Sequence, residues 1–215
     1  MSHDDFEVEP VEGLPERPPE GEEILWQGRP NWWQLTWESL SLPWVLGYFA
    51  VLALWRFVSV VDQMPFSQAI AATLPFAVLC AIVVGLLCFV GYVQARCAVY
   101  TVTNRRVAMR IGAALTMTLN IPYTQMANAM LDLRKKGTGT IAFETMGDTR
   151  LSYILCWPHV RPWYINPTQP SLRCIPDAEK VAELIADAAQ ARVSQPQVVR
   201  KPQAAPDADA VVAAE

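Results

Sequence analysis

The chain has 215 residues, of which 52% are hydrophobic and 18% are charged, with a formal net charge of −4. Soluble domains carry about 25% charged residues, so this composition favours a membrane protein over an ordinary soluble domain. The acidic balance also argues against a nucleic-acid-binding protein.

The first 22 residues are rich in Pro and acidic side chains, as in the run PERPPEGEE (residues 15–23). Such a segment cannot bury enough apolar surface to fold, so we predict a disordered acidic leader over residues 1–22. The start of the chain has no apolar core, which excludes a cleavable signal peptide and an Arg-rich transit peptide. We therefore expect a cytoplasmic N-terminus.

Residues 23–42 and the position just after them are rich in tryptophan. Tryptophan prefers the headgroup layer of a bilayer, where its ring is half buried and its N–H still finds a partner. We therefore predict an interfacial segment over residues 23–42, with a Trp-rich soluble core as the alternative. The predicted anchors are Trp26, Trp32, Trp33, Trp37 and Trp44.

Two apolar segments follow, and each is long enough to cross a hydrocarbon core of about 30 Å. We predict transmembrane helices over residues 43–62 and 69–93, joined by a connector that contains Pro65 into a helical hairpin. The connector has no Lys or Arg, whereas arginines flank the hairpin on its outer ends. The positive-inside rule then places both termini of this multi-pass protein in the cytoplasm.

Arg56 is the ionisable residue within the first apolar segment, and Trp55 and Asp62 lie close to it in the sequence. A charge at the centre of a bilayer costs about 2.5 to 3.5 kcal/mol on insertion scales, so it usually meets a partner or reaches the interface. We predict that Arg56, Trp55 and Asp62 form an intramembrane contact with a partner helix. The structural interpretation, which the position of Arg56 towards the connector favours, is that its long side chain extends to the headgroups, and a contact between Arg56 and Asp62 is a further alternative.

From residue 95 to residue 192 the pattern changes to short β-strands, with strand candidates in RCAVYTVT, VAMRIGAALTMTLNIPY, ANAMLDLRKKGTGTIAFET, TRLSYILCW and PWYIN. The segment IPDAEKVAELIADAAQARV then has apolar residues at helical spacing, which predicts an amphipathic helix that closes the sheet. Residues 193–215 have no periodicity and are predicted to be disordered.

Basic residues gather around the start of this β-rich region. Arg96, Arg105, Arg106 and Arg110 follow the second apolar segment within seventeen positions. Anionic lipid attracts each nearby cation by about 1 kcal/mol. We predict that the four form a basic cluster at the membrane face, which sets the topology and contacts lipid.

No motif for catalysis or cofactor binding occurs in the sequence. The two histidines, His3 and His159, lie outside both apolar segments, so neither can ligate a pigment within the bilayer. GxSxG, Walker and HExxH motifs are absent. The five cysteines show no metal-binding spacing. We therefore predict a protein that is not an enzyme and holds no cofactor or metal.

Three stretches carry a resemblance to a known family: GEEILWQGRPNWW (21–33), YTVTNRRVAMRIG (100–112) and IPYTQMANAML (121–131). Together with the hairpin they resemble bacterial membrane proteins that carry a bacterial PH-like domain. The acidic leader, the Trp cluster and WYINPTQPSLRCIPDAEKVAELIADA (163–188) are similar to the photosynthetic complex assembly proteins of purple bacteria.

This resemblance implies an α+β membrane protein: a two-helix transmembrane hairpin, then a small antiparallel PH-like barrel capped by a C-terminal amphipathic helix. It implies a non-enzymatic assembly factor in the photosynthetic intracytoplasmic membrane. Its partners would be reaction-centre and core antenna (light-harvesting complex) subunits, the lipid bilayer and a second copy in a homodimer, with no nucleic acid. A general envelope or membrane-stress protein and a transporter or channel subunit remain the alternatives.

Overall fold

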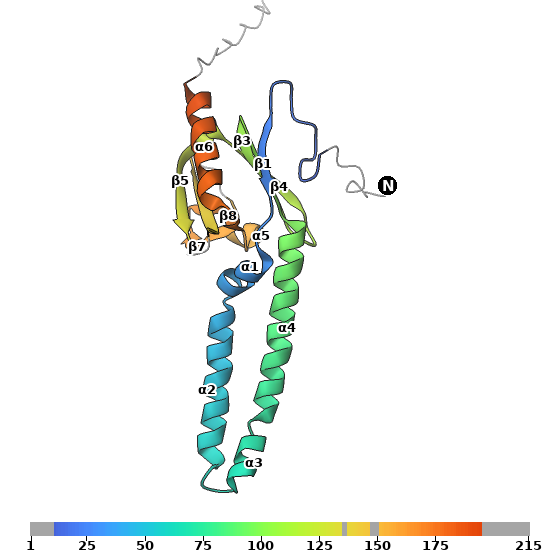
Figure 1. Ribbon diagram of the computed structural model, residues 1–215, viewed down its shortest axis with the longest axis vertical. Helices are drawn as coiled ribbons and strands as arrows, with labels where there is room; N and C mark the ends of the chain where they lie inside the picture. Colours follow the sequence, from blue (N-terminus) through green and yellow to red (C-terminus); the bar gives the residue numbers. More distant parts are fainter. Residues whose placement is uncertain (1–10, 135–136, 147–150, 195–215) are drawn as a thin grey trace, which may run out of the picture.

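The computed structural model describes residues 11–134, 137–146 and 151–194. These residues form a long helical hairpin and a β-domain at one end of it (Figure 1). The hairpin consists of α2 (Leu42–Val60), α3 (Phe66–Ala71) and α4 (Leu74–Cys97). The stretches Leu42–Val60 and Phe66–Cys97 are long and apolar enough to cross a membrane, and only 11% and 6% of their most apolar windows are buried. The hairpin therefore presents an apolar surface that the described chain leaves uncovered.

The second helix of the hairpin differs from the prediction in two ways. It is broken at residues 72–73, which separates α3 from α4, and it continues past residue 93 to Cys97. The break arises because Pro75 has no N–H and its ring would collide with a carbonyl one turn earlier, so α4 starts with this proline in its first turn. The first helix lies close to its predicted range of 43–62.

The first sheet of the β-domain contains strands from both sides of the hairpin. Its order is β1 (Ile24–Gly28), β2 (Val99–Thr103), β3 (Arg106–Ile111) and β4 (Met117–Pro122), all antiparallel. Gly28 lies opposite Tyr100, so the chain leaves this sheet for the hairpin and returns to the neighbouring strand. The domain is therefore not confined to residues 95–192, and the segment 23–42 is not interfacial throughout.

The second sheet has the order β5-β6-β8-β7 and is also antiparallel. Its strands are β5 (Met126–Leu133), β6 (Gly139–Thr145), β7 (Val160–Ile165) and β8 (Thr168–Ile175), and the short 3-10 helix η1 (Tyr123–Gln125) leads into β5. The strand predicted in TRLSYILCW is wrong, because its described part contains the helical turn α5 (Tyr153–Cys156). Strand β8 was not predicted, because Pro170 within it and Pro167 just before it hide the alternation.

The core lies between the two sheets and under α6 (Ala178–Val193). Tyr100, Met109, Phe143 and Leu172 are fully buried there. Val181, Ile185 and Ala188 of α6 follow helical spacing and pack against this core, which confirms the predicted capping helix. The architecture of a helical hairpin plus two antiparallel sheets closed by a helix is that of a PH-like domain, as predicted.

The leader packs on the β-domain from residue 11 onward. Leu14 is 1% exposed, and a bridge joins it to Val11. Gly13 has φ +80°, and a Cβ there would lie 2.6 Å from Cγ1 of Val99, so only glycine fits. The prediction of a disordered leader over 1–22 is therefore wrong from Val11. Residues 1–10 and 195–215, for which disorder was also predicted, lie outside the described residues.

Candidate functional site

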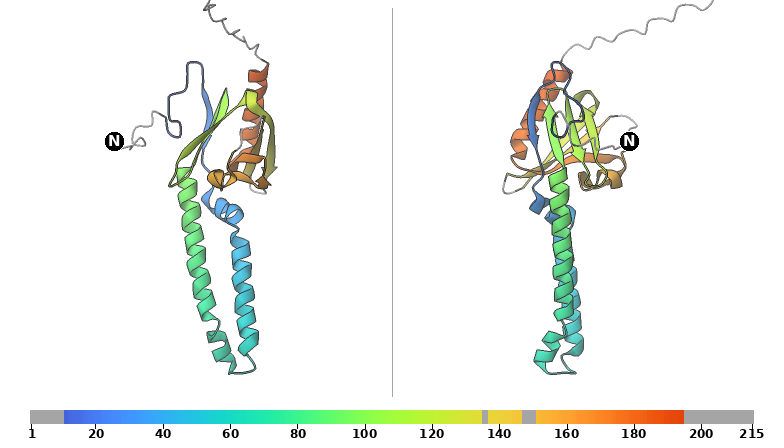
Figure 2. Two further views of the ribbon diagram at one scale, coloured as in Figure 1. Left: turned by 180° about the vertical axis from the view of Figure 1, so that it is seen from behind. Right: turned by 90° about the vertical axis from the view of Figure 1, so that its right-hand side faces the viewer.

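Helix α1 (Trp32–Ser39) lies between the hairpin and the β-domain (Figure 2). Asn31 caps it, since its Oδ1 accepts hydrogen bonds from the amides of Trp33 and Gln34 at 3.1 and 3.2 Å. Thr36 packs so closely against α4 that any side chain at Gly91 would collide with it. Helix α1 is therefore packed against the hairpin on one face and is free to contact the β-domain with another.

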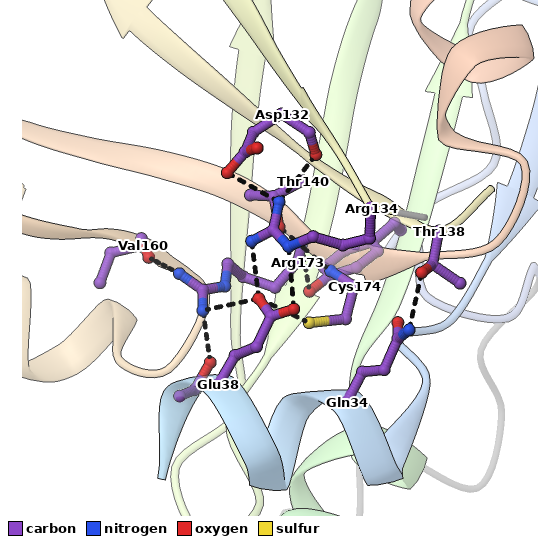
Figure 3. A network of polar contacts seen from close by, with 11 residues as sticks. Gln34, Glu38, Asp132, Arg134, Thr138, Thr140, Val160, Arg173 and Cys174 are labelled. Atoms are coloured by element: carbon purple, nitrogen blue, oxygen red, sulfur yellow. Dashed lines mark hydrogen bonds and ion pairs between the residues drawn. The ribbon is translucent and has the colours of Figure 1, made fainter. Parts of the chain in front are cut away.

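A polar network joins α1 to the second sheet, and we call it the proximal junction (Figure 3). The carboxylate of Glu38 accepts hydrogen bonds from Nε and Nη2 of Arg134 at 2.9 and 2.7 Å. Gln34 donates to Oγ1 of Thr138 at 2.7 Å, and the amide of Asn31 donates to the carbonyl of Cys174 at 2.9 Å. The bidentate pairing of Glu38 with Arg134 fixes the orientation of the two side chains as well as their distance.

Arg173 is the buried cation of the proximal junction, with a side chain only 3% exposed. Its Nη1 donates to the carbonyl of Val160 at 3.2 Å and its Nη2 to Oγ of Ser39 at 2.9 Å, while Oε2 of Glu38 lies 3.8 Å away. A buried guanidinium is tolerated only when it is paired and hydrogen-bonded. Glu38 therefore neutralises cations from two strands of the domain at once.

Cys174 lies beside the same carboxylate, with Sγ 3.7 Å from Oε2 of Glu38. Burial, and next the negative charge of Glu38, raise the pKa of this thiol to about 12. The thiol therefore stays protonated and donates to Glu38, so it is not a nucleophile.

Behind the proximal junction, Tyr100 and His159 form a buried pair, with 2.6 Å between the hydroxyl and Nδ1. Burial lowers the pKa of His159 to about 3, and the positive charge of Arg173 lowers it further in the same direction. The hydroxyl also accepts from the amide of Arg173 at 3.3 Å, so it links the neutral imidazole to strand β8. His159 is thus structural, as its sequence context indicated; His3 lies outside the described residues.

A second attachment, the distal clamp, joins the leader to the turn between β2 and β3. The carboxylate of Glu22, whose side chain is 2% exposed, accepts from Nε of Arg106 at 2.8 Å and from Oγ1 of Thr103 at 2.9 Å. Asn104 exchanges main-chain and side-chain hydrogen bonds with Gly21 and Glu23. The stretches GEE and VTNRR therefore form one structural unit.

The predicted tryptophan anchors divide between two environments. Trp32, Trp33 and Trp37 are 42 to 48% exposed on α1, and Trp44 is 80% exposed in the first turn of α2. Trp32 also packs edge-to-face on Tyr92 of α4. Trp26, by contrast, lies on β1 opposite Val102 and packs against the domain core. Its prediction as an interfacial anchor is wrong, because strand pairing places it within the sheet.

The four predicted basic residues do not form one cluster. Arg96 lies in the last turn of α4, and Arg110 lies opposite Val99, the first residue of β2 after the hairpin. Arg105 and Arg106 lie at the other end of β2, about 16 Å along an extended strand of five residues. Arg105 donates to the carbonyl of Glu20, and Arg106 belongs to the distal clamp.

The predicted intramembrane residues all lie near the connector end of α2. Trp55 is 75% exposed, and the side chains of Arg56 and Asp62 are exposed as well. Within the described part of the chain, no ion pair joins Arg56 to Asp62. A contact between these two residues is therefore not formed, and Arg56 faces outward.

Sequence reasoning missed the residues of the proximal junction. Glu38 lies in α1, Arg134 directly after β5 and Arg173 in β8, and no spacing in the sequence connects them. The signal that was available is the isolated charge of Arg173 in the otherwise uncharged stretch TQPSLRCI, since a charge within a buried strand requires a partner.

A groove of about 640 Å³ lies between β5 and α6. Small apolar side chains such as Ala129 and Ala186 line it, with Glu179 and Glu183 on the α6 side. Across the described ranges, no three His, Cys, Asp or Glu side chains are placed together to hold a metal ion.

Comparisons with known proteins agree with this architecture. The bacterial PH domain family matches residues 41–189, which include the hairpin and most of the β-domain. A protein of Rhodobacter capsulatus, described as an uncharacterized 23.7 kDa protein in the puhA 5′ region, is 44% identical over 206 residues, which cover 95% of this chain and 96% of that protein. No solved structure matches. By these matches and by its fold, the chain belongs to the bacterial PH domain family.

Proposed function

We propose that this protein is a membrane-anchored, non-enzymatic assembly factor for the photosynthetic reaction centre and its core light-harvesting complex. The observation that carries the proposal is the Rhodobacter capsulatus relative, which is named for its position in the puhA 5′ region and aligns over nearly its whole length. The motifs of this chain also resemble the reaction-centre assembly protein PuhB of purple bacteria. A gene context of this kind favours a role in photosynthesis over a general one.

In this proposal α2 and α4 span the inner, photosynthetic intracytoplasmic membrane, with both termini in the cytoplasm. Two features support it: the helices expose apolar side chains along their length, and Arg29, Arg96 and Arg110 gather at the β-domain end. The loop after Val60 contains no Lys or Arg, as expected on the opposite side. The test is to insert at Gln63 a reporter enzyme that works only outside the cytoplasm. The reporter should be active, which would place this loop on the opposite side of the membrane from the termini.

The clients in this proposal are newly inserted reaction-centre and antenna subunits, held against the exposed face of the hairpin. Arg56 and Trp55 lie on that face without a partner in the described chain, so a polar group of a client helix could satisfy Arg56. Arg56→Leu should lower the yield of assembled complex, and Arg56→Lys, which keeps the charge, should restore it. Normal yield with Arg56→Leu would remove Arg56 as a client contact.

The decisive test is deletion of the gene. Reaction-centre content should fall while pigment synthesis and transcription of the subunits continue, and photocrosslinking from positions 45–60 of α2 should capture a subunit. A crosslink between two copies would show the proposed homodimer. Normal reaction-centre content would eliminate the proposal and favour an envelope or membrane-stress role.

A transporter or channel subunit is the remaining alternative. It predicts solute flux in vesicles that contain the purified chain and loss of that flux with Arg56→Leu. We expect no flux, because Arg56 is the one charged side chain of the two helices away from their β-domain end, which offers little material for a polar pathway.

A further inference from the structure

We propose that one face of the β-domain is a second membrane-contact surface, which seats the domain on the lipid headgroups. This α5–β7 face consists of Ile154, Leu155, Trp163 and Ile165. The inference rests on the membrane anchoring in the proposed function, but it does not depend on any client.

The side chains of this face are far more exposed than apolar residues of a folded domain usually are. Ile154 is 84% exposed, Trp163 is 91% exposed, and Leu155 and Ile165 are 60% and 66% exposed. Contiguous apolar patches of this kind mark sites of contact with a protein or a membrane. Trp163 also has φ +67°, an unfavourable conformation for a bulky residue, and so holds its ring outward at a cost in backbone energy.

The position of the face identifies lipid as its occupant. A cavity of about 230 Å³ is lined by Ser39 and Ser41 on one side and by Tyr153, Trp157 and Trp163 on the other. Ser41 immediately precedes α2, so the α5–β7 face lies at the level where the chain enters the hairpin. Figures 1 and 2 show α5 and β7 on the side of the domain from which α2 and α4 leave.

The turn between β3 and β4 also exposes an apolar side chain at the hairpin end of the domain. Leu115 is 80% exposed in the turn between β3 and β4, and this turn follows Arg110, which pairs with the first residue of β2 beside the end of α4. In the described residues of the β-domain, the large apolar side chains with at least 80% exposure are Leu115, Ile154 and Trp163. All three lie at the hairpin end of the β-domain. If the whole domain surface faced solvent, there would be no reason for these side chains to gather at one end.

The polar groups around the face match the headgroup layer. The guanidinium of Arg161 lies 4.0 Å from the centre of the Tyr164 ring, and its Nη1 donates to Oε1 of Gln169 at 3.1 Å. An ordered cation on a Tyr ring, in the strand that also carries the exposed Trp163, suits lipid phosphates above an acyl boundary. A client surface would not need this alignment with the end of the hairpin.

The test places a photoreactive benzoylphenylalanine at single positions of the full chain, reconstituted without any client in vesicles of phosphatidylcholine and phosphatidylglycerol. Positions 163 and 115 should each give about tenfold more lipid adduct than position 193, which corresponds to about 1.4 kcal/mol of preference for lipid. Val193 is the matched control, since it is 66% exposed at the end of α6 away from the hairpin.

Position 51 within α2 separates this inference from the anchor itself. Lipid adduct at position 51 but not at position 163 would overturn lipid contact by the α5–β7 face and leave the membrane anchor intact. Protein adduct alone at position 163 would show that a protein, and not lipid, covers this face. No adduct at 51 would overturn the anchor and the docking together. In a double variant, Ile154→Asp with Trp163→Asp, lipid adduct at position 165 should disappear while adduct at 51 is unchanged.

Discussion

The segment before the hairpin is attached to the β-domain at two places, and the two attachments are built differently. The distal clamp joins neighbouring motif residues through Glu22, Thr103 and Arg106, on a turn that the first sheet already holds. The proximal junction joins α1 to two strands of the second sheet through a buried guanidinium. The clamp fixes an edge strand, whereas the junction fixes the angle between hairpin and domain.

The largest difference between the two attachments should appear when their carboxylates are removed. Glu38→Ala leaves Arg173 buried without its anion, so it should lower the free energy of unfolding by about 3 kcal/mol. Adding Arg173→Met should recover part of this loss, because it removes the unpaired charge. Denaturation of the detergent-solubilised chain, followed by tryptophan fluorescence, measures the cycle. Additive losses would show that the two side chains do not interact.

Lowering the pH should reduce the free energy of unfolding through His159, which lies behind the proximal junction. Its folded pKa of about 3 lies below the unfolded value of about 6.5, so the unfolded state binds the proton first as the pH falls. Its contribution is complete above pH 6.5 and declines by about 1.4 kcal/mol for each pH unit between about 6.5 and 3. Unfolding of His159→Gln, compared with the unchanged chain at pH 7.5 and 5, isolates this term. Equal slopes would contradict a buried neutral imidazole.

The distal clamp should respond more weakly and only locally. Glu22→Gln keeps the shape of the side chain but replaces charge-assisted hydrogen bonds with neutral ones, so the loss should be about 1 kcal/mol. Hydrogen exchange should become faster in Val11–Gly28 and stay unchanged in β6 and β8. Glu16→Gln, at an exposed position of the same segment, is the control and should change neither. Faster exchange throughout the domain would mean that the clamp holds more than the edge.

The smallest effects separate the two ends of β2. Arg105→Ala should change stability by less than about 0.5 kcal/mol and leave lipid binding unaltered, since the half-buried Arg105 donates to a main-chain carbonyl of the leader and lies far from the hairpin. Arg96→Ala should weaken retention of phosphatidylglycerol by about 1 kcal/mol. Native mass spectrometry of lipid-bound states measures both. Equal lipid loss in the two variants would restore the single basic cluster predicted from the sequence.

The contrast between the two attachments also explains what the sequence could predict. The hairpin, strands β2 to β6 and α6 follow from hydropathy and periodicity, which are local properties, whereas β8 does not. Strand β1 was hidden because Trp26 reads equally well as a membrane anchor, and its partner strand lies about seventy residues later. The proximal junction depends on contacts among Glu38, Arg134 and Arg173, which are far apart in the sequence. No local sequence pattern predicts such contacts.

The pairing of β1 with β2 also constrains how the protein is made. These neighbouring strands enclose the whole hairpin, so both ends of the hairpin must emerge on the same side of any membrane that α2 and α4 cross. During synthesis β1 cannot pair with β2 until α4, the second long helix, has been produced. The completed sheet therefore acts as a topological check: a chain with only one helix inserted has β1 and β2 on opposite sides of the membrane and cannot close the domain.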